Sequence, residues 1–166
     1  MGFRPTSNMA QAKGATMVEV LVSLLILSLG LLGVAGLQTT GLRSNQSAYL
    51  RSQATHIASD MADRMRANLP AVDAGNYDNV NSNSVPADPG CIKSATGCTS
   101  TQLAQHDIRE WSLTSKNALP LFVGTVSKDG MSTAEASDDV YVITVRWNDV
   151  ADKNLPTKSL IIRVRM

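Results

Sequence analysis

A single acidic residue stands at the head of a long apolar run near the start of this chain. Glu19 is followed by residues 20–37, which carry no charge. About 20 apolar residues, rising ~1.5 Å each in an α-helix, are enough to cross the hydrocarbon core of a membrane. A carboxylate inside such a helix costs a few kcal/mol, roughly 2.5 to 3.5 for an Asp-like charge at its centre. We therefore expect Glu19 to be functional and to need a partner for its charge.

The sequence just before Glu19 can supply that partner. If the chain is cut after Gly14, Ala15 gains a free α-amine about one helical turn from the Glu19 carboxylate. An amine and a carboxylate at the same depth would offset the cost of burying either charge alone.

Charge along the chain predicts how it is placed in a membrane. The leader, residues 1–14, contains Arg4 and Lys13 and no acidic residue, so the positive-inside tendency puts it in the cytoplasm. Residues 15–37 then form the membrane and assembly helix, and residues 38–166 form a head domain on the far side. Loss of the leader changes the formal net charge from +1 to −1, with 13 basic residues against 14 acidic ones. So small a charge gives no sign of a nucleic-acid-binding field.

Two other interpretations of the apolar run remain open. An ordinary secretory signal would be cut after a small-residue box such as residues 33–35, but the run exceeds the apolar stretch of about 7 to 15 residues found in such signals. A plain single-span anchor would carry Glu19 by accident. Neither interpretation explains why a glycine precedes the only carboxylate of the region by five positions.

The residues at this junction resemble the class III signal of type IV prepilins and pseudopilins. The shared features are Lys13-Gly14 before a small residue, a Glu at the fifth position after the cut, and an unbroken apolar helix. Ala15 departs from the pattern, because most members of the superfamily carry Phe at that position. The resemblance implies cleavage between Gly14 and Ala15 by a prepilin peptidase, N-methylation of Ala15, and a role for Glu19 in subunit assembly.

Further residues resemble one branch of that superfamily, the minor pilins called type IV pilus modification protein (PilV). They are Glu19-Val20-Leu21-Val22 with Leu29-Gly30-Leu31-Leu32-Gly33, and Asp63-Arg64-Met65-Arg66-Ala67-Asn68. The resemblance implies a structural or priming subunit of the type IV pilus, with a part in motility and adhesion. It implies contacts with other minor pilins, the major pilin, the inner-membrane assembly machinery and a tip adhesin. It also implies that the chain spans the bacterial inner membrane once and then enters the pilus, with its head periplasmic or extracellular.

Two other functions fit parts of the sequence. One is a minor pseudopilin of type II secretion, and the other, from a different class, is a membrane-anchored periplasmic binding module. An enzyme is not expected, because His56 and His106, the only histidines, have no nucleophile or metal cluster at a useful spacing. No cofactor and no metal site are expected.

The helix should continue beyond the membrane as one amphipathic element. Its apolar residues recur at spacings of three and four: Leu50, Ala54, Ile57, Ala58, Met61, Ala62, Met65 and Leu69. Asp60 and Arg64 stand four apart on the polar face and can pair. Pro70 should close the helix near Leu69, because the residue before proline is pushed out of the α region. The polar link at residues 38–47 contains Gly41, so a bend or local melting is expected there.

Residues 70–100 are rich in Asn, Ser, Asp, Gly and Pro and predict a long surface loop. Cys91 and Cys98 lie in it and are the only cysteines. In a domain outside the cytoplasm they favour a disulfide that closes a small loop. Zinc binding is the weaker alternative, because two thiols without a second pair or a nearby His do not complete a four-ligand site.

The rest of the chain predicts one helix and then a small sheet between residues 121 and 166. The helix, residues 101–118, should bury one face: Leu103, Ala104, Ile108 and Trp111. The predicted strands are 121–126, 140–147 and 159–166, with the middle one alternating apolar and polar side chains. The fold class is therefore α+β and type IV pilin-like, a long N-terminal helix packed on a small antiparallel sheet.

Arg163 and Arg165 lie on the last predicted strand. As a pair without aromatic platforms they are a weak signal for DNA binding. We expect them to act as charged guards on a sheet edge, and we do not expect a nucleic-acid partner.

Overall fold

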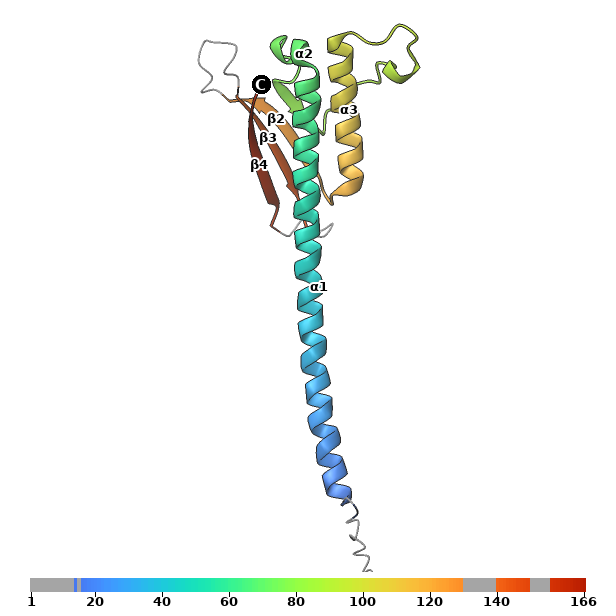
Figure 1. The fold of residues 1–166 in the computed structure, drawn as a ribbon, viewed down its shortest axis with the longest axis vertical. Coiled ribbons are helices and arrows are strands. Elements are labelled where there is room, and N and C mark those ends of the chain that lie inside the picture. Colours follow the sequence, from blue (N-terminus) through green and yellow to red (C-terminus); the bar gives the residue numbers. More distant parts are fainter. Residues whose placement is uncertain (1–13, 15, 130–139, 150–155) are drawn as a thin grey trace, which may run out of the picture. The chain divides into compact units, whose positions relative to one another are not determined.

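The structure is a computed structural model, and it describes residue 14 and residues 16–129, 140–149 and 156–166. It divides into two units, Met1–Arg43 and Ser44–Met166, which are taken one at a time below. The elements in chain order are α1 (Met17–Ala67), α2 (Leu69–Asp73), β1 (Asn79–Asn81), the 3-10 turn η1 (Cys91–Lys93), α3 (Ser100–Ala118), β2 (Val123–Lys128), β3 (Val140–Trp147) and β4 (Lys158–Arg165) (Figure 1).

Helix α1 is continuous from Met17 to Ala67, so the local melting that we expected at residues 38–47 does not occur. A glycine inside a helix costs only about 1 kcal/mol relative to alanine, and Gly41 alone is not enough to break this one. The hydroxyls of Thr39 and Thr40 donate hydrogen bonds to carbonyls one turn earlier, at 3.0 and 3.2 Å, and so stay within the helix.

Helix α1 ends at Ala67, two residues before the predicted end near Leu69. Asn68 leaves the helical conformation, with φ −131° and ψ 52°. Its side-chain amide donates to the backbone carbonyl of Ser100 at 2.8 Å, which ties the end of α1 to the start of α3. Pro70 does not end a helix here. It lies in the first turn of α2, where its missing N–H is not needed.

The amphipathic stripe of α1 forms one side of the core in the second unit. Its buried residues are Leu50, Ala54, Ile57, Ala58, Met61, Ala62 and Met65, as the periodicity predicted. Leu69 is the one predicted member that is wrong, because it lies beyond the end of α1 and is 47% exposed. The opposite side of the core comes from β3, where Tyr141, Ile143, Val145 and Trp147 are buried.

The sheet has four antiparallel strands in the order β1-β2-β3-β4. Strand β3 coincides with the predicted 140–147, and β2 and β4 lie within two residues of their predicted positions. The first strand was missed, since residues 70–100 were expected to be loop and in fact hold α2, β1 and η1. Strand β1 has only three residues, and only Val80 is buried, opposite Val126 of β2. A strand this short has no alternation to detect.

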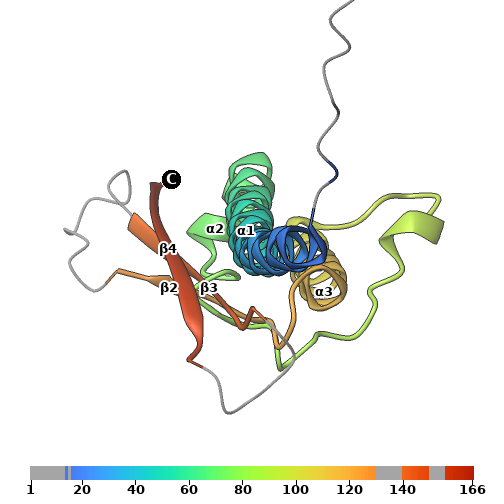
Figure 2. The same ribbon diagram turned by 90° about the horizontal axis from the view of Figure 1, so that it is seen from below.

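Figure 2 shows α1 and α3 side by side over one face of the sheet. Trp111 of α3 is buried where these elements meet, and its indole N–H donates to the carbonyl of Ile57 in α1 at 2.8 Å. The ring meets Phe122 edge to face, with centroids 5.5 Å apart. It also lies against Gly124 of β2, since a Cβ there would stand 2.2 Å from the ring.

Helix α3 begins with a side-chain cap. Thr99 is the N-cap, and its side chain and that of Gln102 form a reciprocal capping box. The buried residues of α3 are Ala104, Asp107, Ile108, Trp111, Ser112 and Ser115. Leu103 was predicted on this face and is instead 37% exposed. Half of the buried residues of α3 are polar. The spacing of its apolar residues therefore predicted the buried face only in part.

Replacing Gly124 with Ala should destabilise the head. The new methyl would overlap Trp111 and Phe122, and such overpacking costs about 1–3 kcal/mol. The free energy of unfolding in urea measures the loss. Gly41→Ala is the matched control, because no atom lies within 4 Å of its Cβ position and the change should not destabilise. Equal stability of the Gly124→Ala and wild-type proteins would contradict this packing.

Candidate processing and assembly segment

The expected cleavage site lies just before α1. Gly14 is exposed and outside the helix, and no atom lies within 4 Å of where its Cβ would be. Ala15 lies outside the described residues. Met17 is the first residue of α1, so Gly14 is not part of the helix. A protease needs its substrate in an extended form, and Gly14 is free of the constraint that helical hydrogen bonds would impose.

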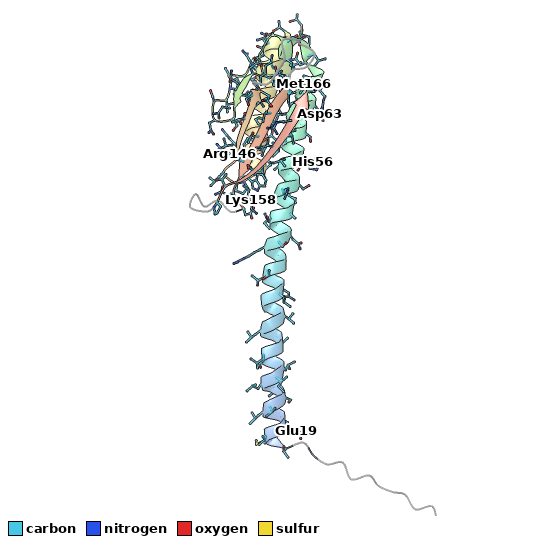
Figure 3. All side chains as sticks on the ribbon, turned by 90° about the vertical axis from the view of Figure 1, so that its left-hand side faces the viewer. Glu19, His56, Asp63, Arg146, Lys158 and Met166 are labelled. Atoms are coloured by element: carbon cyan, nitrogen blue, oxygen red, sulfur yellow. A yellow bond between two sulfur atoms is a disulfide. The ribbon has the colours of Figure 1, made fainter. Side chains whose placement is uncertain are left out.

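Glu19 lies in the first turn of α1 and is exposed (Figure 3). Its backbone N–H donates to the side-chain oxygen of Thr16 at 3.3 Å. Thr16 and Glu19 thus have the spacing of a capping box, of which this bond is one half. A Thr three residues before a Glu at a helix start is a recognisable signal in the sequence, but this relation was not predicted.

The position of Glu19 also matters electrostatically. A helix N-terminus carries a partial positive charge, and a carboxylate in its first turn is typically stabilised by about 0.3–1 kcal/mol. Within the part of the chain that the structure describes, no cation pairs with Glu19. A charged partner would therefore have to come from elsewhere.

The part of α1 that follows is apolar on all sides. Its most apolar stretch has a mean hydropathy of 2.6 and is 0% buried. By length and composition, α1 is the one helix among the described residues that could cross a membrane. The hydroxyls of Ser23 and Ser28 donate to carbonyls within the helix, at 2.8 and 2.7 Å. Such internal bonding is what a helix in lipid requires, because hydrocarbon offers no hydrogen-bond partner.

The predicted disulfide is present, with Cys91 and Cys98 bonded and their Cα atoms 5.5 Å apart. It closes a small surface loop that begins with η1. Residues 92–97 are all exposed, and Ile92 is 83% exposed. The bond constrains a surface segment and does not cross the core.

The histidines do not form a reactive centre in the described residues. His56 is exposed on α1, whereas the Nδ1 atom of His106 is buried without a hydrogen-bond partner. No group of three or more His, Cys, Asp or Glu side chains among the described residues could hold a metal ion. Arg163 lies on β4 at the edge of the sheet, 69% exposed, with its Nε atom 3.5 Å from a carboxylate oxygen of Asp129.

A buried polar network, which was not predicted from the sequence, joins three segments of the head. Asp107 of α3 is 7% exposed, and it accepts hydrogen bonds from Arg64 of α1 at 3.2 Å and from the Tyr77 hydroxyl at 2.9 Å. Arg64 also pairs with Asp60 at 3.0 Å, as predicted. A buried carboxylate is stable only when it is paired and hydrogen-bonded, and these contacts meet both needs. The network fixes α1, α3 and the segment before β1 together.

The surroundings of Tyr77 predict that the stability of the head depends on pH. Burial, together with the negative charge of Asp107, raises the pKa of the Tyr77 phenol above its ordinary value of about 10. The unfolded chain would release this proton near pH 10, whereas the folded chain would hold it. The stability that this group contributes is therefore complete below pH ~10 and is lost as the pH rises further.

Replacing Tyr77 with Phe should cost about 1.5–3 kcal/mol near neutral pH, because Asp107 loses a hydrogen bond to its charge. The difference in stability from wild type should narrow above pH ~10, since only the wild type then loses the contribution of the phenol. Urea unfolding between pH 7 and 11 measures both effects. Tyr49→Phe is the control, because Tyr49 is 57% exposed and its removal should leave the profile unchanged. A constant difference across this range would contradict the assignment.

Comparison with known families supplies independent information about the head. Residues 36–109 match the model of the Tt1218-like family, described as type IV pilin Tt1218. The match covers fewer than half of the 166 residues and runs from within α1 into α3, through α2, β1 and η1. Neither the curated proteins nor the solved structures gave a match. The long N-terminal helix packed on a four-stranded antiparallel sheet is a type IV pilin-like α+β fold, and with the family match it supports a type IV pilin.

Proposed function

We propose that this chain is a minor pilin, a structural or priming subunit in assembly of the type IV pilus. The observation that carries the proposal is the composition of α1. Its first part is apolar on every side with one carboxylate in the first turn, and its second part belongs to a head that matches a type IV pilin family. Pilins are structural proteins and not enzymes, so the proposed role is assembly and not catalysis.

We propose that the chain is first inserted in the bacterial inner membrane. The leader, with Arg4 and Lys13, remains cytoplasmic, and the apolar part of α1 spans the bilayer. A prepilin peptidase cuts between Gly14 and Ala15, and the new amine is N-methylated. The proposed partners are the peptidase, the other pilins and the inner-membrane assembly machinery, with a tip adhesin a further partner.

Two kinds of subunit share this signal, pilins and the pseudopilins of type II secretion. The family match favours the pilin, because the matched family is one of type IV pilins. The resemblance of Glu19-Val20-Leu21-Val22 and of residues 63–68 to type IV pilus modification proteins favours a minor subunit. Deletion of the gene separates the two: the pilin proposal expects loss of pili or of twitching movement, whereas a pseudopilin would stop protein secretion.

Glu19 is proposed to set the position of the subunit in the filament. On parallel helices, the Glu19 carboxylate of one subunit and the Ala15 amine of its neighbour can meet at one depth in the apolar core. Breaking a buried pair by removing one partner costs about 3–5 kcal/mol, because a charge is left uncompensated. Subunits out of register would incur this cost, and so the pair selects one axial stagger.

Replacing Gly14 with Val should leave the precursor uncut. The branched side chain would obstruct the peptidase at a junction where glycine offers none, and it would restrict the backbone. Mass spectrometry of the chain from membranes should find Met1 at its N-terminus in the variant and N-methyl-Ala15 in wild type. Gly2→Val, the same change far from the junction, should be processed normally. A Gly14→Val chain that still begins at Ala15 would refute the cleavage site.

Replacing Glu19 with Leu should separate insertion from assembly. The variant should enter the membrane at least as well as wild type and still be cut, because an apolar helix with one charge fewer is easier to insert. Its share in sheared pili should fall about tenfold or more, since a hydrogen bond to a charged group contributes roughly 1.5–3 kcal/mol. Immunoblots of membrane and pilus fractions measure this share.

The control for Glu19 removes a carboxylate elsewhere on the same helix. Asp63 is exposed and pairs with Arg66 at 2.8 Å, so Asp63→Asn should alter neither fraction. If Glu19→Leu enters pili as well as Asp63→Asn does, the proposed registry role of Glu19 is wrong.

A further inference from the structure

A cavity of about 270 Å³ lies in the head between α1 and the end of the sheet formed by β3 and β4. Its lining comes from two residues of α1, the last residue of β3 and the first two of β4: Ser47, Arg51, Trp147, Lys158 and Ser159. Figure 3 shows Lys158 at the same end of the sheet as Arg146 of the neighbouring strand. None of the described residues that line this cavity is acidic.

The lining side chains are suited to donate hydrogen bonds. Lys158 is held in place, because its ammonium donates to the hydroxyl oxygen of Ser47 at 2.7 Å and to a carboxylate oxygen of Asp149. Since the Ser47 oxygen accepts from Lys158, its own hydroxyl proton is free to donate. Ser159 supplies a second hydroxyl, and Trp147, which is 2% exposed, supplies a rigid wall.

The charge of Arg51 decides what the cavity attracts. Asp149 compensates the charge of Lys158, with which it forms an ion pair. The Arg51 guanidinium has no ion pair or hydrogen bond within the described residues, although the backbone carbonyl of Arg51 accepts from the Thr55 hydroxyl. The described residues of the cavity therefore carry about one uncompensated positive charge, on a planar group whose paired N–H donors match two oxygens of one anion.

We propose that this cavity binds a phosphate group, with Arg51 as its charged ligand and with Lys158, Ser47 and Ser159 as further donors. A tetrahedral phosphate presents several oxygens and can accept from donors on α1 and on β4 at once. A planar carboxylate offers only two oxygens and uses fewer of these donors. By joining the two elements, the bound phosphate would also stabilise the head.

Such a phosphate can come from a lipid headgroup or from a free phosphate ion. Ser47 and Arg51 follow the end of the apolar run at Leu37 within the same helix, ten and fourteen residues on. Lipid headgroups are the phosphates concentrated next to a membrane span, and anionic lipids attract basic residues there. The chemistry of the site is the same for both sources, and the test must separate them.

The experiment uses the full-length chain in dodecyl maltoside micelles. In one arm, inorganic phosphate is titrated and its binding is followed by phosphorus-31 NMR. In the other, phosphatidylglycerol or diacylglycerol is added and native mass spectrometry counts the bound lipid. Diacylglycerol has the same chains without a phosphate, so it reports the lipid that the apolar helix holds by itself. The wild-type chain should bind one phosphate-bearing ligand more tightly than this background.

Arg51→Gln should weaken that binding about tenfold or more, as expected when a charged hydrogen-bonding group is lost. The matched control is Arg66→Gln, which removes one positive charge from the same helix away from the cavity and should change the affinity less than twofold. A second variant, Ser159→Glu, changes an exposed residue and places a carboxylate in the cavity. It should also abolish binding while leaving the circular dichroism spectrum unchanged.

Each outcome decides the proposal. Loss of lipid binding in both cavity variants identifies a headgroup site, and loss of inorganic phosphate binding alone identifies a site for the free ion. Failure of the wild type to bind either ligand above the diacylglycerol background overturns the proposal. Equal affinities of Arg51→Gln and Arg66→Gln overturn it too, because binding would then follow net charge and not this cavity. The proposal does not depend on the role in pilus assembly, since processing and filament entry are not measured here.

Discussion

The head depends on one side chain, Trp111, which brings α1, α3 and β2 together. Its ring fills the space above Gly124 and meets Phe122, while its indole N–H is bonded to the carbonyl of Ile57 in α1. A large aromatic residue contributes most to a core when its apolar ring is buried and its polar atom still has a partner. Both conditions are met only if the two helices and the strand are in place at the same time. The position of Trp111 therefore requires a glycine on β2 and a particular spacing of α1 and α3.

Helix α1 has two kinds of surface because it serves two environments. In its first part apolar side chains cover every face, and in its second part they form a stripe that is buried against the sheet and α3. A helix that is apolar all round would aggregate in water, so its first part needs lipid or the apolar helices of other subunits. The second part buries its apolar stripe against other elements of its own chain. If assembly uses the first part, as proposed, the head is left free to present its own surface.

The elements that the sequence predicted well are those with a clear period. The stripe of α1 and the alternation of β3 follow from spacings of three, four and two, and both are confirmed. Strand β1 was missed because one buried residue in three gives no period. The Asp107 network could not be predicted either. In the sequence, an aspartate in a helix looks like a surface residue. Only the fold brings Asp107 together with its partners, Arg64 and Tyr77. Of the candidate site, the disulfide is confirmed, whereas the roles of Gly14 and Glu19 remain predictions.

The position of Glu19 in the first turn of α1 gives its carboxylate two roles that reinforce each other. The Thr16 hydroxyl oxygen accepts from the backbone N–H of Glu19, and the partial positive charge of the helix N-terminus favours the Glu19 carboxylate itself. The proposed cut after Gly14 would create a positive amine two residues before α1 begins, and a cation at a helix N-terminus is unfavourable. The negative charge of Glu19 and the positive charge of the amine would then compensate each other. A glutamine would keep the backbone bond to Thr16 but could not neutralise the amine, so an ionisable residue is needed once the chain has been cut. Processing would thus make the Glu19 carboxylate, which the helix dipole already favours, half of a charge pair, available within one subunit or between neighbours.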